Sequence, residues 1–439
     1  MEKEKKADFR YDTGPTKVPW AAVGENLNVD DITEIIRFLI PPDESKDEIA
    51  YQEQLEKVKE EILKLREKGG YATKLSLGDK VKEAEEELKK FLKVKYTVLL
   101  TNATAGFEIA QKFAGLRAGD EVIAPAITFC STINYPLQVG AKVVLADIDP
   151  HTLNIDPEDV ARKVTKKTKV IIAVHIGGYP SEMDKIMEIA NENNIIVLED
   201  AAHALGGSYR GKMSGTIGHF GSFSLHEVKN ITSGGEGGVL VTDQPEGEYF
   251  SQSRFVGFDI GNPIPYWLYD VVALKGRDGR YTVAGNHSFT EIQAVVLLSQ
   301  LKRLPQIIET RRKRAEYLNK RFKDIEGLIT PPLDTKEIKS TYHLYLLRVD
   351  PAKIKGGIQA FKKKLTEKGV TQIPHFAPLY RFSYMKQLGY DTEAMKKTCP
   401  KAEEVFLHQF THLPLYPLTE EQVKTMADLV IEAVEELKI

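Results

Sequence analysis

The residues before position 96 are rich in Lys and Glu, and their apolar residues recur at helical spacing. Between Glu44 and Lys68 the apolar positions fall three or four residues apart and share one helical face: Leu55, Val58, Ile62 and Leu65. Gly69-Gly70 ends this predicted helix. A second charged helix is predicted over residues 79–92, with an inward face of Val81, Ala84, Leu88 and Phe91. The charge runs indicate solvated helix faces, and a partner-binding helix is the alternative.

From residue 96 onward, short apolar runs alternate with helical patterns. The predicted strands are residues 97–100, 122–124, 143–146, 170–174, 195–198 and 239–242. The helices between them include residues 104–116, 157–164 and 182–191. This alternation predicts crossover connections and an α/β fold with a largely parallel sheet. Because ligands of such sheets bind at the carboxyl ends of the strands, we expect the chemistry there.

Beyond Phe289 the pattern becomes helical, over residues 291–301 and then over 305–322. After a break at Pro331-Pro332, a strand-like segment and two helices predict a smaller α/β unit, at residues 342–349, 358–368 and 420–437. The predicted organisation therefore has three parts: a charged helical extension over 1–74, a large α/β domain over 75–304 and a small C-terminal α/β domain over 305–439.

Composition narrows the class of protein. The chain has 439 residues, 42% hydrophobic and 28% charged, which excludes a disordered chain, a collagen-like fibre and a small disulfide scaffold. A formal net charge of −3 gives no basic excess for binding nucleic acid. Neither a membrane span nor a signal peptide is predicted. Cys130 and Cys399 are expected to be free thiols, so we expect a cytoplasmic protein.

Two candidate motifs lie where predicted strands end. Small residues at 101–107 open a helix and leave backbone N–H groups free to bind an anion such as phosphate, although a helix N-cap by Thr104 explains them equally well. Glu199 and Asp200 end a buried strand and point to opposite faces. Burying a carboxylate there is costly unless it meets a cation, and a helix cap is the alternative.

Two further motifs follow along the chain. Lys229 stands between an apolar run and the glycine-rich residues 231–238. Most lysines are solvated surface groups, and the alternative in this small-residue, partly apolar setting is an amine with a lowered pKa that acts as a nucleophile. The glycines permit positive φ angles and close approach to a ligand. Asn286 follows a glycine just before a helix, and a local turn is the simplest explanation.

Taken in this order, a phosphate-binding turn, a strand-end aspartate and a later lysine describe a pyridoxal phosphate site. Asp200 would keep the pyridine nitrogen protonated, and Lys229 would form the Schiff base. The sequence here resembles the DegT/DnrJ/EryC1/StrS sugar aminotransferases, which are fold type I pyridoxal phosphate enzymes. The resemblance runs from Leu75 to the C-terminus and is dense over residues 101–243. It implies a large, mostly parallel mixed sheet sandwiched by helices, with a smaller C-terminal α/β domain.

The resemblance also gives roles to individual residues. Lys229 matches the lysine that binds the cofactor, and Asp200 matches the partner of the pyridine nitrogen. Phe129 matches the aromatic residue that stacks on the cofactor ring. His203 matches a position beside the cofactor's 3-hydroxyl group.

Further matched positions concern the phosphate and the neighbouring subunit. Thr104 and Ala105 match the phosphate-binding turn, and Ser224 matches a hydroxyl donor to the same phosphate. Asn286 matches an asparagine that the family supplies from the neighbouring subunit. The resemblance therefore implies a homodimer with shared active sites.

Two departures from the family pattern border the site. The family has one residue fewer than this chain between the lysine and the following glutamate, which are Lys229 and Glu236 here. The family also carries an arginine two positions after the matched asparagine, where this chain has Ser288. Both departures concern the substrate and the amino donor rather than the cofactor.

The resemblance implies an aminotransferase that moves an amino group from glutamate, through pyridoxamine phosphate, to a keto sugar that is nucleotide-linked. The alternatives are a pyridoxamine phosphate-dependent sugar dehydratase, whose known members carry histidine where Lys229 stands, and a non-catalytic regulatory homologue. The lysine favours amino transfer, and the intact catalytic set favours an enzyme. His175 and His226 are interpreted as structural. No Cys/His cluster has metal-ligand spacing, so no metal is expected.

Overall fold

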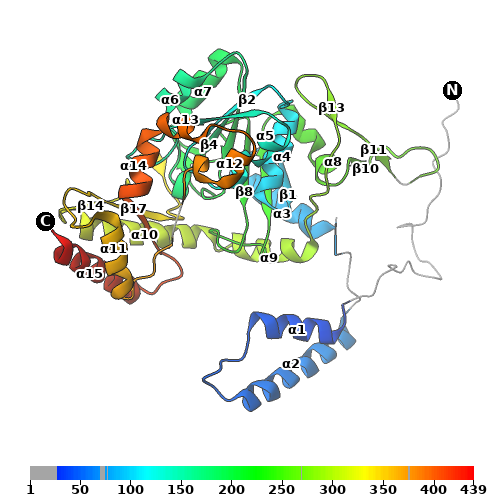
Figure 1. The fold of residues 1–439 in the computed structure, drawn as a ribbon. Coiled ribbons are helices and arrows are strands. Elements are labelled where there is room, and N and C mark those ends of the chain that lie inside the picture. The colour runs from blue at the N-terminus through cyan, green and yellow to red at the C-terminus, as the bar shows by residue number, and fades with distance from the viewer. Residues whose placement is uncertain (1–26, 70–74, 77, 268, 374–375) are drawn as a thin grey trace. The chain divides into compact units, whose positions relative to one another are not determined.

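The computed structural model describes residues 27–69, 75–76, 78–267, 269–373 and 376–439 (Figure 1). It divides into two units: Met1–Leu75 with Ile264–Leu268, and Ser76–Pro263 with Tyr269–Ile439. Of the predicted N-terminal extension, residues 1–26 and 70–74 lie outside the described part of the chain.

The first unit contains two helices, α1 (Val29–Leu39) and α2 (Glu48–Lys68). Helix α1 was not predicted from the sequence; it begins with a capping box between Asn28 and Asp31. The helix predicted between Glu44 and Lys68 is confirmed as α2. It starts at Glu48, because the Asp47 side chain caps it by accepting the backbone N–H groups of Ile49 and Ala50. An ion pair of 2.7 Å joins Lys59 on α2 to Asp30 on α1.

The second unit is built on a seven-stranded sheet in the order β1-β9-β8-β5-β4-β2-β3. Its strands are β1 (Tyr96–Leu100), β2 (Glu121–Pro125), β3 (Lys142–Ala146), β4 (Thr168–Val174), β5 (Ile196–Asp200), β8 (Phe220–Ser224) and β9 (Gly238–Thr242). The strands from β8 through β3 pair in parallel, and β9 runs antiparallel to both β8 and β1. The predicted mostly parallel mixed sheet is confirmed, with β8 as the strand that the sequence analysis missed.

Helices cover both faces of this sheet because successive strand residues point to opposite sides. They are α3 (Asp79–Leu92), α4 (Ala103–Phe113), α5 (Asn134–Gln138), α6 (Pro157–Lys163), α7 (Met183–Asn193), α8 (Phe250–Arg254) and α9 (Glu291–Leu301). Val98 and Leu100 of β1 pack in the core that contains α4, whereas Leu99 packs with α3 and α9. Val81, Ala84 and Leu88 of α3 are buried, as the helical spacing predicted.

The C-terminal part has its own sheet and its own apolar core. The sheet joins β14 (Leu328–Ile329), β16 (Tyr345–Val349) and β17 (Phe410–Leu413), all antiparallel. Its core involves α10 (Leu304–Phe322), α11 (Gly357–Glu367) and α15 (Glu420–Leu437). The strand predicted from residue 342 begins only at Tyr345, because Tyr342 has a φ of 44°, outside the extended region. In Figure 1, α9 and α10 follow one another in nearly one line.

The remaining elements are short. The helices are α12 (Ser383–Gln387), α13 (Thr392–Lys397) and α14 (Pro400–His408). The strands are β6 (Ser208–Tyr209), β7 (Lys212–Met213), β10 (Phe258–Asp259), β11 (Asp270–Val271), β12 (Leu274–Lys275), β13 (Tyr281–Thr282) and β15 (Ile338–Lys339).

Gly238 lets β9 approach the start of α4. This glycine pairs with Leu100 on one side and with Ser224 on the other. A Cβ atom at this position would overlap the backbone of Asn102 and Ala103. The first turn of α4 can therefore pack directly against β9 because Gly238 has no side chain.

We predict that Gly238→Ala destabilises the protein by about 1–3 kcal/mol, because the added methyl group must push away backbone rather than a flexible side chain. Thermal unfolding of the purified variant measures this effect. Gly261→Ala is the matched control, since a Cβ there meets only a side-chain oxygen of Asp259 at 3.4 Å. Equal melting temperatures for the two variants would contradict the prediction.

Candidate active site

A cavity of about 540 Å³ lies where β5 and β8 end, at the edge of the sheet where the sequence predicted the chemistry. The predicted site residues that line it are Thr104, Phe129, Asp200, His203, Ser224 and Lys229. The C-terminal part of the chain contributes further wall residues: Arg311, His343, Phe376, His412 and Tyr416. Of the predicted set, Ala105 and Asn286 are not among the described residues that line this cavity.

Asp200 is a buried carboxylate at the end of β5, with 5% of its surface exposed. The Thr132 hydroxyl donates to its Oδ2 at 2.8 Å, and the Ala202 backbone N–H donates to its Oδ1 at 3.2 Å. Burial raises the pKa of this carboxyl, against the opposing effects of both hydrogen bonds and of the Lys229 charge. No Lys, Arg or His among the described residues forms an ion pair with Asp200, so a cation placed beside it would be stabilised.

Glu199 points to the opposite face from Asp200, as predicted. Its carboxylate accepts three backbone N–H groups from the turn at residues 215–218 and lies 2.8 Å from His175 Nε2. The Ser181 backbone N–H donates to His175 Nδ1 at 3.1 Å, so the His175 ring carries its proton on Nε2. The His175 backbone N–H in turn donates to the Asp200 carbonyl oxygen. This buried network confirms the structural interpretation of His175 and anchors the strand end that carries Asp200.

The start of α4 offers backbone donors to the cavity. Asn102, and not Thr104, is the N-cap residue, and its side chain accepts the Ala105 N–H at 2.9 Å. The alternative of an N-cap at Thr104 is therefore wrong, because the helix begins at Ala103 and its cap lies two residues before Thr104. Within the described structure the N–H groups of Ala103 and Thr104 have no acceptor, and the Ser224 hydroxyl also lines the cavity. Together they form a corner suited to a phosphate.

Lys229 reaches the cavity from a loop that glycines shape. Gly234 and Gly235 have φ angles of 94° and 119°, which favour glycine. The Gly235 carbonyl accepts the Glu227 N–H at 2.9 Å, which closes the loop. No residue of the described structure makes a hydrogen bond or ion pair with the Lys229 amine. Burial lowers the pKa of this amine to about 8, although the Asp200 charge opposes the shift.

His203 and Phe129 present rings to the same cavity. The Gly177 backbone N–H donates to His203 Nδ1 at 3.2 Å, so the neutral ring carries its proton on Nε2. The His203 ring stacks on His343 with centroids 4.5 Å apart. Phe129 leaves 59% of its surface exposed, which is unusual for a large apolar side chain in a cavity wall. An exposed ring at this place is available to stack on a planar ligand.

The comparisons with known proteins agree with this geometry. The family model of the DegT/DnrJ/EryC1/StrS aminotransferase family matches residues 56–434. The chain belongs to that family. Among curated relatives, the spore coat polysaccharide biosynthesis protein SpsC of Bacillus subtilis is 35% identical over 374 residues, covering 83% of this chain and 90% of SpsC. The 3-amino-5-hydroxybenzoate synthase of Amycolatopsis mediterranei is 31% identical, covering 81% of this chain and 91% of the synthase.

Solved structures of this aminotransferase family share the fold. PseC of Helicobacter pylori, an aminotransferase involved in the biosynthesis of pseudoaminic acid, superposes with a TM-score of 0.72 at 26% identity, over 83% of this chain and 94% of PseC. Spr1654 of Streptococcus pneumoniae, assigned as a sugar aminotransferase, has a TM-score of 0.74 in its pyridoxal phosphate form, at 28% identity over 85% of this chain and 95% of Spr1654. The fold type I architecture is thereby confirmed.

Pyridoxal phosphate is the cofactor of this aminotransferase, and the residues present fit it. The free N–H groups at the start of α4 suit its phosphate. The unpaired Asp200 carboxylate suits its protonated ring nitrogen. The uncommitted Lys229 amine suits its aldehyde. When bound, the cofactor supplies an electron sink for a carbanion.

Two wall residues of the aminotransferase, His343 and Arg311, were not singled out from the sequence as site residues. The orientation of the His343 ring follows from Asn230. The Asn230 amide nitrogen donates to the His203 carbonyl oxygen at 3.3 Å, so its Oδ1 accepts from His343 Nδ1 at 3.1 Å. His343 thus presents an unprotonated Nε2, and burial holds its pKa well below the usual range. The second residue is Arg311 on α10, which the sequence shows only as one of several basic residues. Neither has a local sequence motif, because both depend on how the C-terminal part packs.

Asn286 forms a local turn, as its surroundings in the sequence suggested. Its backbone pairs with Phe255, and its side chain accepts the Ser288 N–H at 3.2 Å. No group of three or more His, Cys, Asp or Glu side chains in the described structure is placed to hold a metal ion. Likewise, within those residues no helix has the length and apolar content to cross a membrane.

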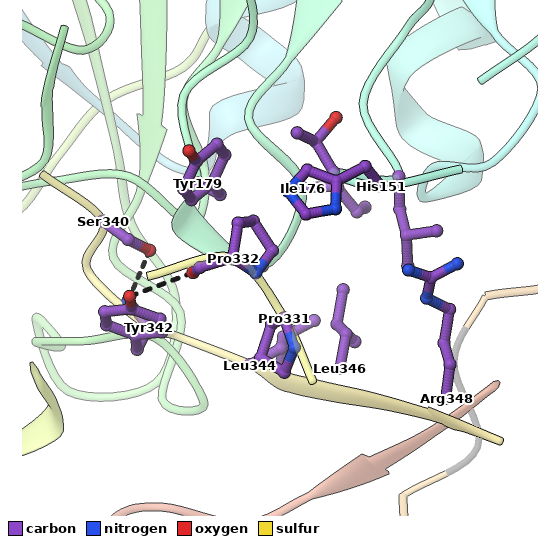
Figure 2. A pocket seen from close by; sticks show the side chains of 13 residues that line it. His151, Ile176, Tyr179, Pro331, Pro332, Ser340, Tyr342, Leu344, Leu346 and Arg348 are labelled. Carbon is purple, nitrogen blue, oxygen red and sulfur yellow. Dashed lines mark hydrogen bonds between the residues drawn. The ribbon is translucent and has the colours of Figure 1, made fainter. Parts of the chain in front are cut away.

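A second, much smaller pocket lies behind the segment that carries His343. Figure 2 shows Tyr179, Pro332, Tyr342 and Leu346 around it, with the Tyr342 hydroxyl donating to the Pro332 carbonyl oxygen at 3.1 Å. Its volume of about 20 Å³ admits a single water molecule and no cofactor.

We predict that the Lys229 amine of the cofactor-free enzyme reacts with an aldehyde with a pH midpoint near 8, because only the neutral amine is nucleophilic and its pKa is lowered to about 8. The reaction slows as the pH falls below 8 and reaches a plateau above it. Stopped-flow absorbance with pyridoxal phosphate measures this profile.

Asp200→Asn is the comparison, because the Asp200 charge raises the Lys229 pKa. In this variant the pH midpoint of the aldehyde reaction should move to a lower value. A midpoint near 10.5, the ordinary value for lysine, would contradict the lowered pKa.

Proposed function

We propose that this aminotransferase transfers an amino group from an amino acid, glutamate in the first instance, to the keto group of a nucleotide-linked sugar. The observation that carries the proposal is the uncommitted Lys229 amine in the same cavity as Asp200 and the N-terminus of α4. The involvement of PseC in pseudoaminic acid biosynthesis and of SpsC in polysaccharide biosynthesis supports a sugar acceptor. A relative named for 3-amino-5-hydroxybenzoate is the reason to test the acceptor directly.

Lys229 is the proton carrier of the proposed reaction. With its pKa near 8 the amine is partly neutral at physiological pH, so Nζ can accept a proton from the donor's α-carbon and release it again. Asp200 would hold the protonated ring nitrogen of the bound cofactor, because no Lys, Arg or His of the described structure forms an ion pair with its carboxylate. His203 Nε2–H and the Ser224 hydroxyl supply hydrogen-bond donors along the edge of the cavity.

Part of the cavity wall is apolar. Phe107, Val174 and Leu344 line the cavity, and the exposed ring of Phe129 would be available to stack on one side of a planar ring. In such a setting the electrostatic pull of Asp200 on the ring is stronger than in water. The same residues serve both halves of the reaction, because the acceptor half reverses the donor half.

We also propose that two copies of the chain form a homodimer with shared active sites in the cytoplasm. Asn286, the residue matched to the family's asparagine from the neighbouring subunit, is not among the described residues of its own cavity wall. Exposed apolar side chains flank it along the chain, namely Tyr281, Val283, Ile292 and Val295, and a partner would cover them. The two free thiols, Cys130 and Cys399, fit a reducing compartment.

We predict that Lys229→Ala abolishes amino transfer and removes the visible absorbance of the bound cofactor, because no other lysine among the described residues lines the cavity. Turnover should fall by at least about a thousandfold. Assays use glutamate with a panel of nucleotide-linked keto sugars, and mass spectrometry of the product checks for a new nitrogen.

Lys212→Ala is the control, since Lys212 lies in β7 on the surface and does not line the cavity. It should retain wild-type turnover. Normal activity of Lys229→Ala would refute the assignment, and a product that has lost oxygen without gaining nitrogen would indicate the dehydratase instead.

A further inference from the structure

The hydroxyl group of Thr132 holds one oxygen of the Asp200 carboxylate. Thr132 is fully buried in the 3₁₀ helix Cys130–Ile133, and its Oγ1 donates to Asp200 Oδ2 at 2.8 Å. The backbone N–H of Ala202 donates to the other oxygen, Oδ1, at 3.2 Å. Because a carboxylate oxygen can accept two hydrogen bonds, each oxygen keeps the capacity to accept one from a ligand.

A second hydroxyl group orients the first. The Oγ1 atoms of Thr128 and Thr132 lie 2.9 Å apart, and the distance alone does not decide which of them donates. A hydroxyl group carries one proton, and Thr132 gives its proton to the Asp200 carboxylate, so Thr132 Oγ1 accepts from Thr128. Both threonines are buried, and Thr128 lines the large cavity. The hydrogen bonds therefore run in one direction, from Thr128 through Thr132 to Asp200.

This direction favours the ionised form of Asp200. A proton on Oδ2 would need an acceptor where the Thr132 hydroxyl now donates, so both hydroxyl groups would have to turn. Burial raises the pKa of Asp200, and among the opposing effects that of the Thr132 hydroxyl is the largest. Both donors to the carboxylate are neutral, so they stabilise its negative charge without cancelling it. The charge stays available for a cation that a ligand brings.

The turn that carries Thr132 also carries Phe129. The Thr132 backbone N–H donates to the Phe129 carbonyl oxygen at 3.2 Å, which closes the turn between the two residues. Phe129 lines the cavity, whereas Thr132 is not among the described residues of its wall. Phe129 is therefore placed to meet the face of a planar ligand, while Thr132 acts on that ligand only through Asp200.

We propose that Thr132, oriented by Thr128, is a positioning residue that keeps the Asp200 carboxylate ionised and in place to bind the protonated ring nitrogen of pyridoxal phosphate. This inference rests on the cofactor site of the proposed function, but it does not depend on which amino donor or keto acceptor the enzyme uses. Thr132→Val removes the hydroxyl group and keeps the β-branched shape, whereas Thr132→Ser keeps the hydroxyl group.

The test is calorimetric binding of pyridoxamine phosphate to the cofactor-free full-length enzyme, since this form of the cofactor has no aldehyde to react with Lys229. In Thr132→Val its dissociation constant should rise about tenfold, the loss expected when a hydrogen bond to a buried charge is removed. The second ligand is the deaza analogue, in which a C–H group replaces the ring nitrogen. It should bind Thr132→Val no more weakly than wild type, because it has no nitrogen for Asp200 to hold.

Thr242→Val is the matched control. Thr242 is also a buried threonine, but its hydroxyl donates to the His219 carbonyl oxygen at 2.6 Å and the residue does not line the cavity. This variant should bind both ligands as wild type does. Thr132→Ser should restore the affinity for pyridoxamine phosphate to within about threefold of wild type. Thr128→Val removes the orienting donor and should weaken binding of pyridoxamine phosphate alone, by about threefold.

The outcomes separate the possible roles of Thr132. An unchanged affinity of Thr132→Val for pyridoxamine phosphate refutes the positioning role, and so does an equal loss for both ligands, which marks a structural role. If Thr132→Val does not fold, Thr128→Val decides by the same comparison. A wild-type enzyme that binds the deaza analogue as tightly as pyridoxamine phosphate refutes the assignment of Asp200 together with that of Thr132. A wild type that prefers pyridoxamine phosphate, with no selective loss in the variants, refutes the role of Thr132 alone.

Discussion

A buried carboxylate at the end of a central strand is the constraint on which the site depends. Asp200 has little solvent to stabilise its charge, and the described residues give it two neutral donors and no ion-pair partner. Removing a carboxylate from water costs several kcal/mol when no cation compensates. The rest of the site is arranged around this demand: β5 fixes the position, the His175–Glu199 pair anchors the strand end, and the cavity leaves room for a cationic ring.

Two basic side chains that line the same cavity, Lys229 and Arg311, likewise have no ion-pair partner in the described structure. Lys229 has a lowered pKa and no hydrogen bond, and the buried Nε of Arg311 has no hydrogen-bond partner. A protein that needed only stability would pair these cations with carboxylates. Without such a partner, the neutral form of the Lys229 amine is available to attack a carbonyl carbon. The large sheet supplies Asp200 and the C-terminal part supplies Arg311, so the site needs both to be packed together.

Much of this could be predicted from the sequence, because the strand and helix periods are strong and because Asp200 and Lys229 border recognisable apolar and glycine-rich runs. The strand β8 was missed because the two Phe residues of Phe220–Ser224 stand three positions apart among Gly and Ser, which breaks the alternating apolar pattern of a strand. The alternative N-cap at Thr104 lies two residues from the actual cap, Asn102, because Asn and Thr are both good capping residues. Arg311 could not be distinguished from Arg312, because only the packing of α10 decides which one faces the cavity.

The central claim is that Lys229 is the residue that holds the cofactor beside Asp200. Borohydride reduction of the purified holoenzyme would make that bond permanent, and proteolysis with mass spectrometry would locate it. The account predicts one modified peptide, carrying the cofactor mass on Lys229, and no modified peptide after the same treatment of Lys229→Ala. Attachment to another lysine, or an unmodified Lys229 in an enzyme that retains its visible absorbance, would contradict it.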